Sequence, residues 1–264
     1  MNTPLSWREL LAYPSPQAHI VQLYQDEEFL CDAVSTFASS GLARGEAVVL
    51  VATPGHARAL APKLKAKGFN MDVLQMTRQL TVVNAVEVLP RLMVDCMPDV
   101  SEFNQFARGL LQRINARYAK VRWWGEMVGL LWEYGNLPAA LRLEQLADEL
   151  TKRHSMIRFC SFHMDNFDSQ TYGAAFQRLC MIHSHVIPVN DYTRFQNAFE
   201  KAARELLGHD HRTFDKMPSC QGGIPEMPAA AASLLWLREN SPQTADNILN
   251  LTREFYGAPL TLHS

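Results

Sequence analysis

Short apolar runs alternate with longer stretches of helical periodicity, and this order constrains the fold more than any other feature of the chain. The runs are rich in β-branched and aromatic residues, and turn or helix-start signals follow them: His19–Tyr24, Ala47–Ala52, Leu80–Val83, Val121–Trp124 and Met156–Phe162. Such runs are typical of buried parallel strands. Because strands alternate with helices, we expect a three-layer α/β fold with a mostly parallel sheet covered by helices on both faces.

Helical periodicity fills the intervening segments and continues beyond the last run. It covers Asp26–Ser40, Pro54–Lys67, Val86–Met97, Val100–Tyr118, Pro138–His154, Ser169–Ile182 and Tyr192–Leu207. Residues 209–228 carry three prolines and two glycines without periodicity, which predicts a linker. Two further helices are predicted after it, over Pro228–Glu239 and Pro242–Tyr256. We therefore expect one α/β domain with a C-terminal helical extension.

Charge and composition exclude several classes of protein. The formal net charge is −2 and the basic residues are scattered, so the chain lacks the electrostatic footprint of a protein that binds nucleic acid or a membrane surface. Its apolar stretches fall far short of the ~20 residues that span a bilayer, and no signal-peptide pattern opens the chain. The five cysteines are widely spaced without a C-x-x-C pair, as expected of reduced, buried thiols. These features predict a cytoplasmic protein.

The segment after the first apolar run differs from that of a nucleotide-hydrolysing sheet. Ligands bind open parallel sheets at the carboxyl ends of the strands, where a phosphate cradle needs a glycine-rich loop with Lys and Ser or Thr. Here Asp26, Glu27 and Glu28 stand in the first helical turn, where they favour the helix dipole and repel a phosphate. Neither G-x-x-x-x-G-K-[ST] nor G-x-G-x-x-G occurs in the chain. The sequence thus argues against ATP hydrolysis of the usual kind.

Candidate chemistry elsewhere is sparse. Glu126 follows Trp123-Trp124 at the end of a predicted strand, where a carboxylate is either a hydrogen-bonded anchor or a functional acid. The pairs His183-Ser184-His185 and His209-Asp210-His211 have spacing that can chelate zinc, but no further ligand at metal spacing accompanies either. No G-x-S-x-G elbow is present. We therefore predict no catalytic residue, no metal ligand and no cofactor.

A series of short motifs runs in order along the chain: His19–Tyr24, Asp26–Leu30, Gly41–Val48, Gln79-Leu80, Asp95–Asp99, Gly125–Met127, Leu141–Glu144 and His183–His185. As an ordered set they resemble the MEDS domain, a sensory domain named for methanogens, methylotrophs and a dichloromethane-responsive repressor. The resemblance covers residues 17–190 and leaves 191–264 as the helical extension. It implies a RecA-like sheet related to the circadian-clock ATPase KaiC, without the phosphate loop.

The resemblance also implies a function. It suggests a non-catalytic sensory module of bacterial signal transduction that recognises a small ligand, such as a hydrocarbon derivative, or a partner protein at the strand-end crevice. The module would signal to a separate histidine kinase or transcription regulator, and a homodimer is a possible assembly. Four of the candidate ligand-binding residues match recurrent polar positions of the family, and the others come from the strand ends and the aromatic surroundings of Glu126; the set is His19, Tyr24, Asp26, Glu27, Thr53, Asn84, Glu126, Met127, Trp132 and His183.

Three residues depart from the family pattern. Arg78 and Cys96 stand where glycine is expected, and Asn84 stands where aspartate is usual, so a negative charge is absent from that strand end. Two other functions stay open: a nucleotide-binding protein with a degenerate cradle, and a small hydrolase or transferase that uses Glu126 and His183 as acid and base.

The C-terminal extension has an apolar face that could serve either of two purposes. The face either packs on its own domain or docks a partner; its residues are Leu234, Leu235, Leu237, Ile248, Leu249 and Leu251.

Overall fold

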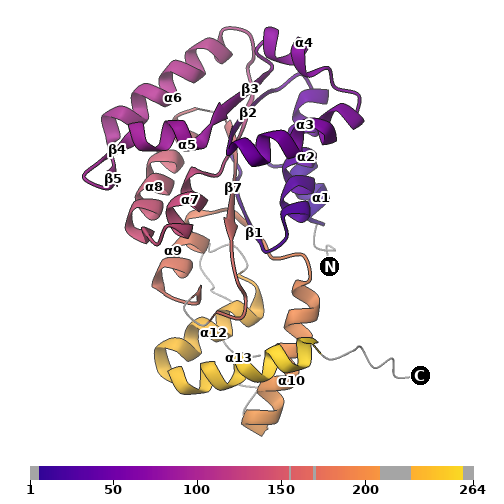
Figure 1. Ribbon diagram of the computed structural model, residues 1–264, viewed down its shortest axis with the longest axis vertical. Coiled ribbons are helices and arrows are strands. Elements are labelled where there is room, and N and C mark those ends of the chain that lie inside the picture. Colours follow the sequence, from indigo (N-terminus) through magenta and orange to yellow (C-terminus); the bar gives the residue numbers. More distant parts are fainter. Residues whose placement is uncertain (1–5, 155, 169–170, 209–226, 258–264) are drawn as a thin grey trace.

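The computed structural model describes residues 6–154, 156–168, 171–208 and 227–257 (Figure 1). Most of the predicted linker over 209–228 lies outside the described residues, as do Cys220 and the His209–His211 pair. Among the other cysteines, Cys31, Cys160 and Cys180 are buried as expected, whereas Cys96 is exposed.

Six parallel strands form one sheet in the order β3-β2-β6-β7-β1-β8. Their bounds are β1 (His19–Tyr24), β2 (Ala47–Ala52), β3 (Leu80–Asn84), β6 (Val121–Gly125), β7 (Met156–His163) and β8 (His185–Ile187). Every residue of β1 and β2 is buried, as expected for strands covered on both faces. The five predicted strands are confirmed.

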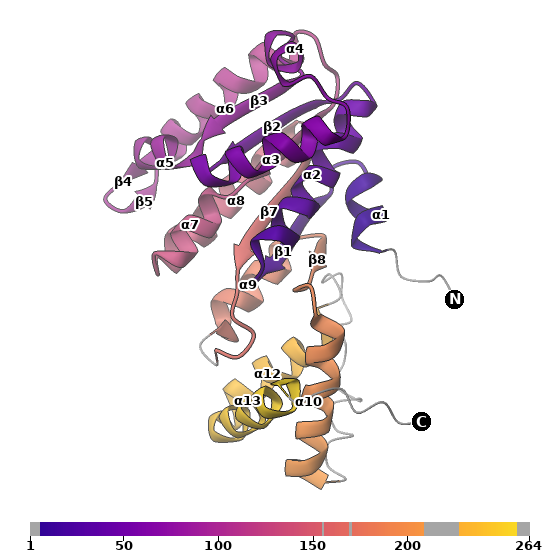
Figure 2. The same ribbon diagram turned by 45° about the vertical axis from the view of Figure 1, so that its right-hand side comes forward.

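Helices cover both faces of this sheet (Figures 1 and 2). One face packs against α1 (Trp7–Ala12), α2 (Glu27–Ala43), α3 (Pro54–Ala66) and α4 (Met71–Met76). The other packs against α5 (Ala85–Val88), α6 (Val100–Asn115), α7 (Met127–Glu133), α8 (Leu137–Arg153) and α9 (Ala174–Ile182). Successive strand residues point to opposite faces, so Ile20 belongs to the first apolar core and Val21 to the second. The expected three-layer α/β fold is confirmed.

The C-terminal helices form a cluster beside the sheet: α10 (Tyr192–Leu207), α12 (Ala229–Asn240) and α13 (Pro242–Gly257) (Figure 2). Their apolar face is buried inside the protein, because Leu234, Leu235 and Ile248 belong to the larger apolar core. Arg253 Nη2 donates to the carbonyl of Phe167, 3.2 Å away, and ties α13 to the loop after β7. The apolar face therefore packs on its own chain, and a domain boundary near residue 190 stays a prediction. Within the described parts of the chain, every helix is too short or too polar to cross a membrane.

The predicted single helix over Val86–Met97 is wrong. The chain forms α5, then a 3₁₀ turn at Leu89–Leu92, then a two-stranded hairpin of β4 (Met93–Val94) and β5 (Met97–Pro98). Pro90 has no backbone N–H for an α-helical hydrogen bond, and left-handed backbone further along the segment ends helical structure. The hairpin turn places Asp95 and Cys96 in the left-handed region, at φ of 50° and 61°. The short elements α4, α7 and β8 had no counterpart in the predicted pattern.

Both departures from the family's glycines fall on left-handed backbone. Arg78 follows the last turn of α4 with φ of 61°, and Cys96 has the same φ in the hairpin. A side chain in this region costs roughly 1–2 kcal/mol that glycine avoids. Arg78 and Cys96 thus hold a strained backbone conformation that glycine adopts without this cost.

We predict that Arg78→Gly raises the free energy of unfolding by about 0.5–1 kcal/mol, because relief of the strained φ exceeds the extra flexibility of the unfolded chain. Urea denaturation measures the change. Arg78→Ala is the matched control, since it removes the same side chain but keeps the strain, and it should give no gain. Equal stability of the two variants would contradict the prediction.

Candidate functional site

At the carboxyl ends of β2 and β6, three side chains from different elements are linked through His56. Glu126 is the residue between β6 and α7, and its Oε1 accepts a hydrogen bond from the Thr53 backbone N–H over 2.5 Å. Its Oε2 lies 2.7 Å from His56 Nδ1. The Nε2 of His56 in turn contacts the carboxylate of Glu27 in the first turn of α2. Glu126 is therefore a hydrogen-bonded anchor that joins β2, α2 and α3.

The other strand-end candidates have local structural partners. The Asp26 carboxylate caps α2 by accepting from the Glu28 N–H over 2.8 Å, and the Asn84 side chain caps α5 by accepting from the Val86 N–H over 3.1 Å. Tyr24 packs edge-to-face on His163, and Trp132 packs edge-to-face on Phe162. These four residues thus stabilise elements near the strand ends.

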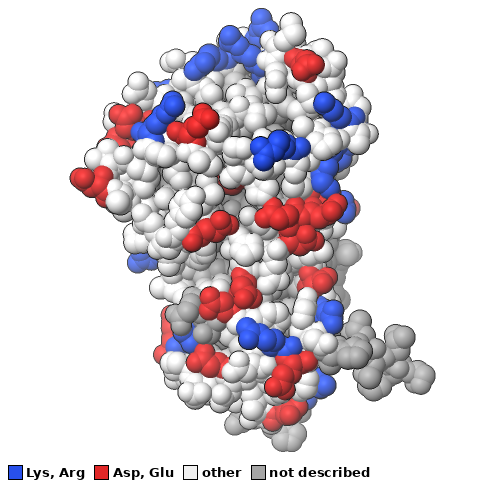
Figure 3. Space-filling view, in the orientation of Figure 1, with Lys and Arg blue, Asp and Glu red and all other residues white. Residues whose placement is uncertain are grey.

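The charge at these strand ends depends on His56. The hydrogen bond to Glu126 opposes the effect of burial and raises the pKa of His56 to about 9, with Glu27 contributing. The imidazole is therefore charged at neutral pH and lies between two carboxylates. Acidic side chains gather on the surface where α2 begins (Figure 3), where Asp26, Glu27 and Glu28 are exposed. An added phosphate would meet this negative charge.

The raised pKa predicts a pH-dependent stability. A group whose pKa is higher in the folded than in the unfolded protein stabilises the fold fully below its unfolded value, near 6.5, and loses this effect as pH rises through about 9. We expect the free energy of unfolding to fall by about 1–3 kcal/mol more in the wild type than in His56→Gln between pH 6.5 and 9.5. Urea denaturation across this range measures it, with His154→Gln as the control variant. Parallel curves for the wild type and His56→Gln would contradict the assignment.

A second group of polar side chains lies on the opposite face of the sheet, around Glu144 of α8. The Glu144 carboxylate has no exposed surface. Its Oε2 lies 3.3 Å from His19 Nε2 and 3.1 Å from Arg158 Nη2, and its Oε1 lies 3.5 Å from His183 Nε2. Although burial alone raises the pKa of Glu144, the neighbouring His183 and Arg158 hold that pKa well below its usual value.

The parallel pairing of β1 with β7 assembles this group. His19 pairs in register with Arg158, and Cys160, two residues further along β7, points to the same face. The Cys160 Sγ lies 3.5 Å from His19 Nε2 and 3.1 Å from Arg158 Nη2. His183 ends α9, and burial lowers its pKa. We call His19, Glu144, Arg158, Cys160 and His183 the buried polar cluster.

The predicted site residues therefore divide between the two faces. Glu27, Thr53 and Glu126 meet on the α2 and α3 side, whereas His19 and His183 meet on the α8 side. The structure does not bring Glu126 and His183 together, so it lends no support to their use as acid and base on one substrate. The candidate set missed His56, Glu144, Arg158 and Cys160. Glu144 stood in a family-like motif and Arg158 and Cys160 in an apolar run, but no sequence signal paired them with His19.

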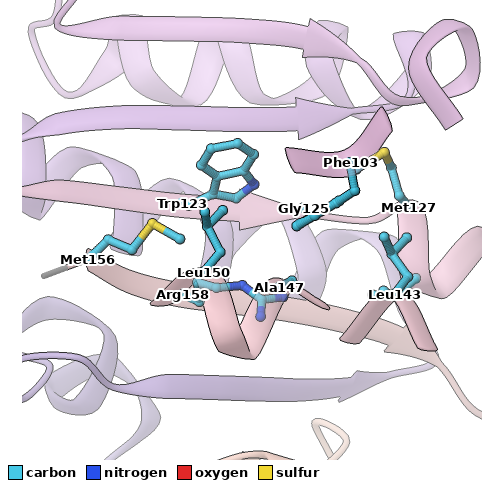
Figure 4. A pocket seen from close by; sticks show the side chains of 10 residues that line it. Phe103, Trp123, Gly125, Met127, Leu143, Ala147, Leu150, Met156 and Arg158 are labelled. Carbon is cyan, nitrogen blue, oxygen red and sulfur yellow. The ribbon is translucent and has the colours of Figure 1, made fainter. Parts of the chain in front are cut away.

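An apolar cavity of about 30 Å³ adjoins this cluster (Figure 4). It lies between the α8 face of β6 and β7 and the helices that cover it, and its lining residues are Phe103, Trp123, Gly125, Met127, Val128, Leu143, Ala147, Leu150, Met156 and Arg158. Met127 is the predicted site residue in this lining. α7 lies close to β7 at Gly129, where a Cβ atom would stand 2.7 Å from the Ser161 carbonyl oxygen. This close approach holds Met127 and Val128 over the cavity.

Comparison with known proteins identifies the family. The model of the MEDS family, the MEthanogen/methylotroph, DcmR Sensory domain, matches residues 18–178. The fold is thus that of a sensory domain, and the chain belongs to the MEDS family, which confirms the resemblance. No curated protein matches the chain. Among solved structures it is similar to PCH-2 of C. elegans, at 12% identity and a TM-score of 0.32 over 95% of this chain and 65% of that chain, a likeness too slight to carry an argument.

Proposed function

We propose that this MEDS domain is a non-catalytic sensor that binds a small hydrocarbon derivative in the apolar cavity beside Arg158. The observation that carries the proposal is the meeting of an apolar cavity with an unpartnered polar atom. Arg158 lines the cavity, and its Nη1 is buried without a hydrogen-bond partner among the described residues. A ligand in the cavity that accepts a hydrogen bond from this N–H would fill the empty space and give Nη1 a partner.

The size of the cavity limits the ligand. Its volume of about 30 Å³ exceeds the roughly 10–15 Å³ that one water needs, but lies far below the several hundred Å³ of a drug-sized site. The occupant therefore has very few heavy atoms. Apolar walls favour a hydrocarbon skeleton, and the buried guanidinium favours one acceptor, such as a halogen or a carbonyl or hydroxyl oxygen. A one- to three-carbon halide, ketone or alcohol meets the polar requirement and enters when the flexible side chains of Met127 and Met156 in the lining move apart.

Arg158 also supplies a route for the signal. Its Nη2 bonds Glu144, and Glu144 contacts His183 at the end of α9. The chain continues from α9 through β8 into α10, which packs against α13. A ligand that draws the guanidinium toward the cavity changes the balance of charge at Glu144. We propose that the C-terminal helices pass this change to a separate histidine kinase or other signalling protein.

The strand-end crevice offers less support for a ligand site. Glu126 is engaged by Thr53 and His56, and Glu27 is engaged by His56. These contacts support a structural role for the crevice and argue against nucleotide binding there. We predict that ATP with magnesium leaves the thermal unfolding temperature unchanged; a saturable rise would instead favour the degenerate nucleotide-binding alternative.

The sensor proposal is tested by titrating the protein with dichloromethane and acetone. We expect a saturable rise in the unfolding temperature and a shift of the Trp123 indole N–H resonance in NMR spectra, because this ring lines the cavity. Ala147→Leu adds bulk to the lining and should abolish both responses.

Ala57→Leu is the matched control, since it makes the same change on partly buried α3, away from the cavity, and should keep both responses. The proposal fails if Ala147→Leu responds like the wild type, or if neither compound perturbs Trp123.

A further inference from the structure

Four potential metal ligands converge in the buried polar cluster. His19 comes from β1, Glu144 from α8, Cys160 from β7 and His183 from the end of α9. One donor atom from each lies within 4.8 Å of all the others, and all four residues are buried. Imidazole, carboxylate and thiolate together form a donor set that suits Zn²⁺ and related divalent transition metals.

The distances from His19 to two of the other donors match those of a tetrahedral shell. Zinc bonds of ordinary length place a nitrogen and a sulfur ligand about 3.6 Å apart, and a nitrogen and an oxygen ligand about 3.3 Å apart. His19 Nε2 lies 3.5 Å from Cys160 Sγ and 3.3 Å from Glu144 Oε2. His183 Nε2 lies 3.5 Å from Glu144 Oε1. His19 Nε2 is thus spaced from Cys160 Sγ and Glu144 Oε2 as ligands of one ion are, and His183 Nε2 lies beside the other Glu144 oxygen.

Both imidazoles are oriented as in metal sites, where the ring nitrogen away from the metal faces a carbonyl or carboxylate. The Nδ1 of His183 lies 2.7 Å from the Leu179 carbonyl oxygen, so Nδ1 carries the proton and Nε2 presents a lone pair to the cluster. The Nδ1 of His19 lies 3.5 Å from the Asp148 carboxylate. The Leu179 carbonyl therefore orients the ring of His183, whereas His19 Nδ1 faces Asp148 without a hydrogen bond among the described residues.

The cluster also contains buried polar atoms that form no hydrogen bond with its other members. His183 Nε2 and Glu144 Oε1 have no hydrogen-bond partner among the described residues. Each such atom costs free energy in a protein interior. A cation between them would satisfy both atoms at once.

We propose that His19, Glu144, Cys160 and His183 form a site for one divalent transition-metal ion, with Zn²⁺ as the expected occupant. The charges balance: an ion of +2 and Arg158 offset the carboxylates of Glu144 and Asp148 and a thiolate at Cys160. The thiol proton leaves for solvent when the ion binds. This site adjoins the apolar cavity through Arg158, but the proposal does not rest on the proposed sensing of a hydrocarbon derivative.

An entry path for the ion exists. His19, Asp148 and His183 line a surface cavity of about 700 Å³ between α8 and the end of α9. An ion from solvent reaches the two histidines and an acidic side chain before it meets the deeper carboxylate and thiol. The bound ion would link β1, β7, α8 and α9.

The site is tested with the full chain after removal of metals by a chelator. Titration with Co²⁺ should give one equivalent of bound ion, visible d–d bands of tetrahedral cobalt, a thiolate charge-transfer band in the near ultraviolet, and release of protons. Zn²⁺ should displace the cobalt and bleach these bands. Elemental analysis of freshly purified protein should find zinc at close to one ion per chain.

Variants assign the donors. Cys160→Ser should remove the charge-transfer band, and His183→Gln should weaken Co²⁺ binding at least tenfold. Cys180→Ser is the matched control, since this thiol is also buried and lies outside the donor set, and it should leave the spectrum unchanged. Circular dichroism verifies that each variant is folded.

The outcome for the wild type is decisive even if a donor variant does not fold. A folded wild-type protein without cobalt bands and without zinc overturns the proposal, as does a charge-transfer band that persists in folded Cys160→Ser. A response to dichloromethane without metal binding would refute the metal site and leave the sensor proposal intact. Metal binding without a response to dichloromethane would refute the sensor proposal and leave the metal site intact.

Discussion

The carboxylate of Glu144, with no exposed surface, sets the condition that the surrounding structure must meet. A buried charge costs several kcal/mol unless cations and hydrogen-bond donors surround it. Here they come from β1 and β7, through His19 and Arg158, while His183 at the end of α9 lies 3.5 Å from the other carboxylate oxygen. These elements must therefore keep their places relative to α8. The same requirement holds Arg158 at the cavity and brings Cys160 within reach of His19, so both proposed sites depend on this one charge.

The sheet separates two kinds of electrostatic arrangement. On the α2 and α3 face, Glu27, His56 and Glu126 satisfy one another and close the strand-end crevice. On the α8 face, the buried polar cluster retains atoms with no hydrogen-bond partner among the described residues, beside an apolar cavity. Groups that satisfy each other stabilise a fold, whereas buried groups left without partners favour an added ligand or ion. The same physical argument that favours a structural role for the strand ends leads us to propose sensing on the α8 face.

The local pattern of the sequence was enough to predict most elements but not their chemistry. β1 and β2 have the predicted bounds because their apolar residues are continuous, and Arg78 and Cys96 were identified as departures that the backbone explains. The helix predicted around Pro90 is wrong because the left-handed turn at Asp95 and Cys96 ends helical structure despite the periodicity of the sequence. His19 and His183 were found through the family resemblance, yet their partners Arg158 and Cys160 depend on the pairing of β1 with β7. No local pattern encodes that pairing between strands so far apart in the chain.

The central claim is that a small ligand binds beside Arg158 on the α8 face. The most direct measurement is a crystal structure of the full chain exposed to dibromomethane, with the bromine atoms located by their anomalous scattering. The claim predicts bromine in the cavity between Trp123 and Arg158. Bromine in the strand-end crevice beside Glu126, or an empty cavity at saturating dibromomethane, would contradict it.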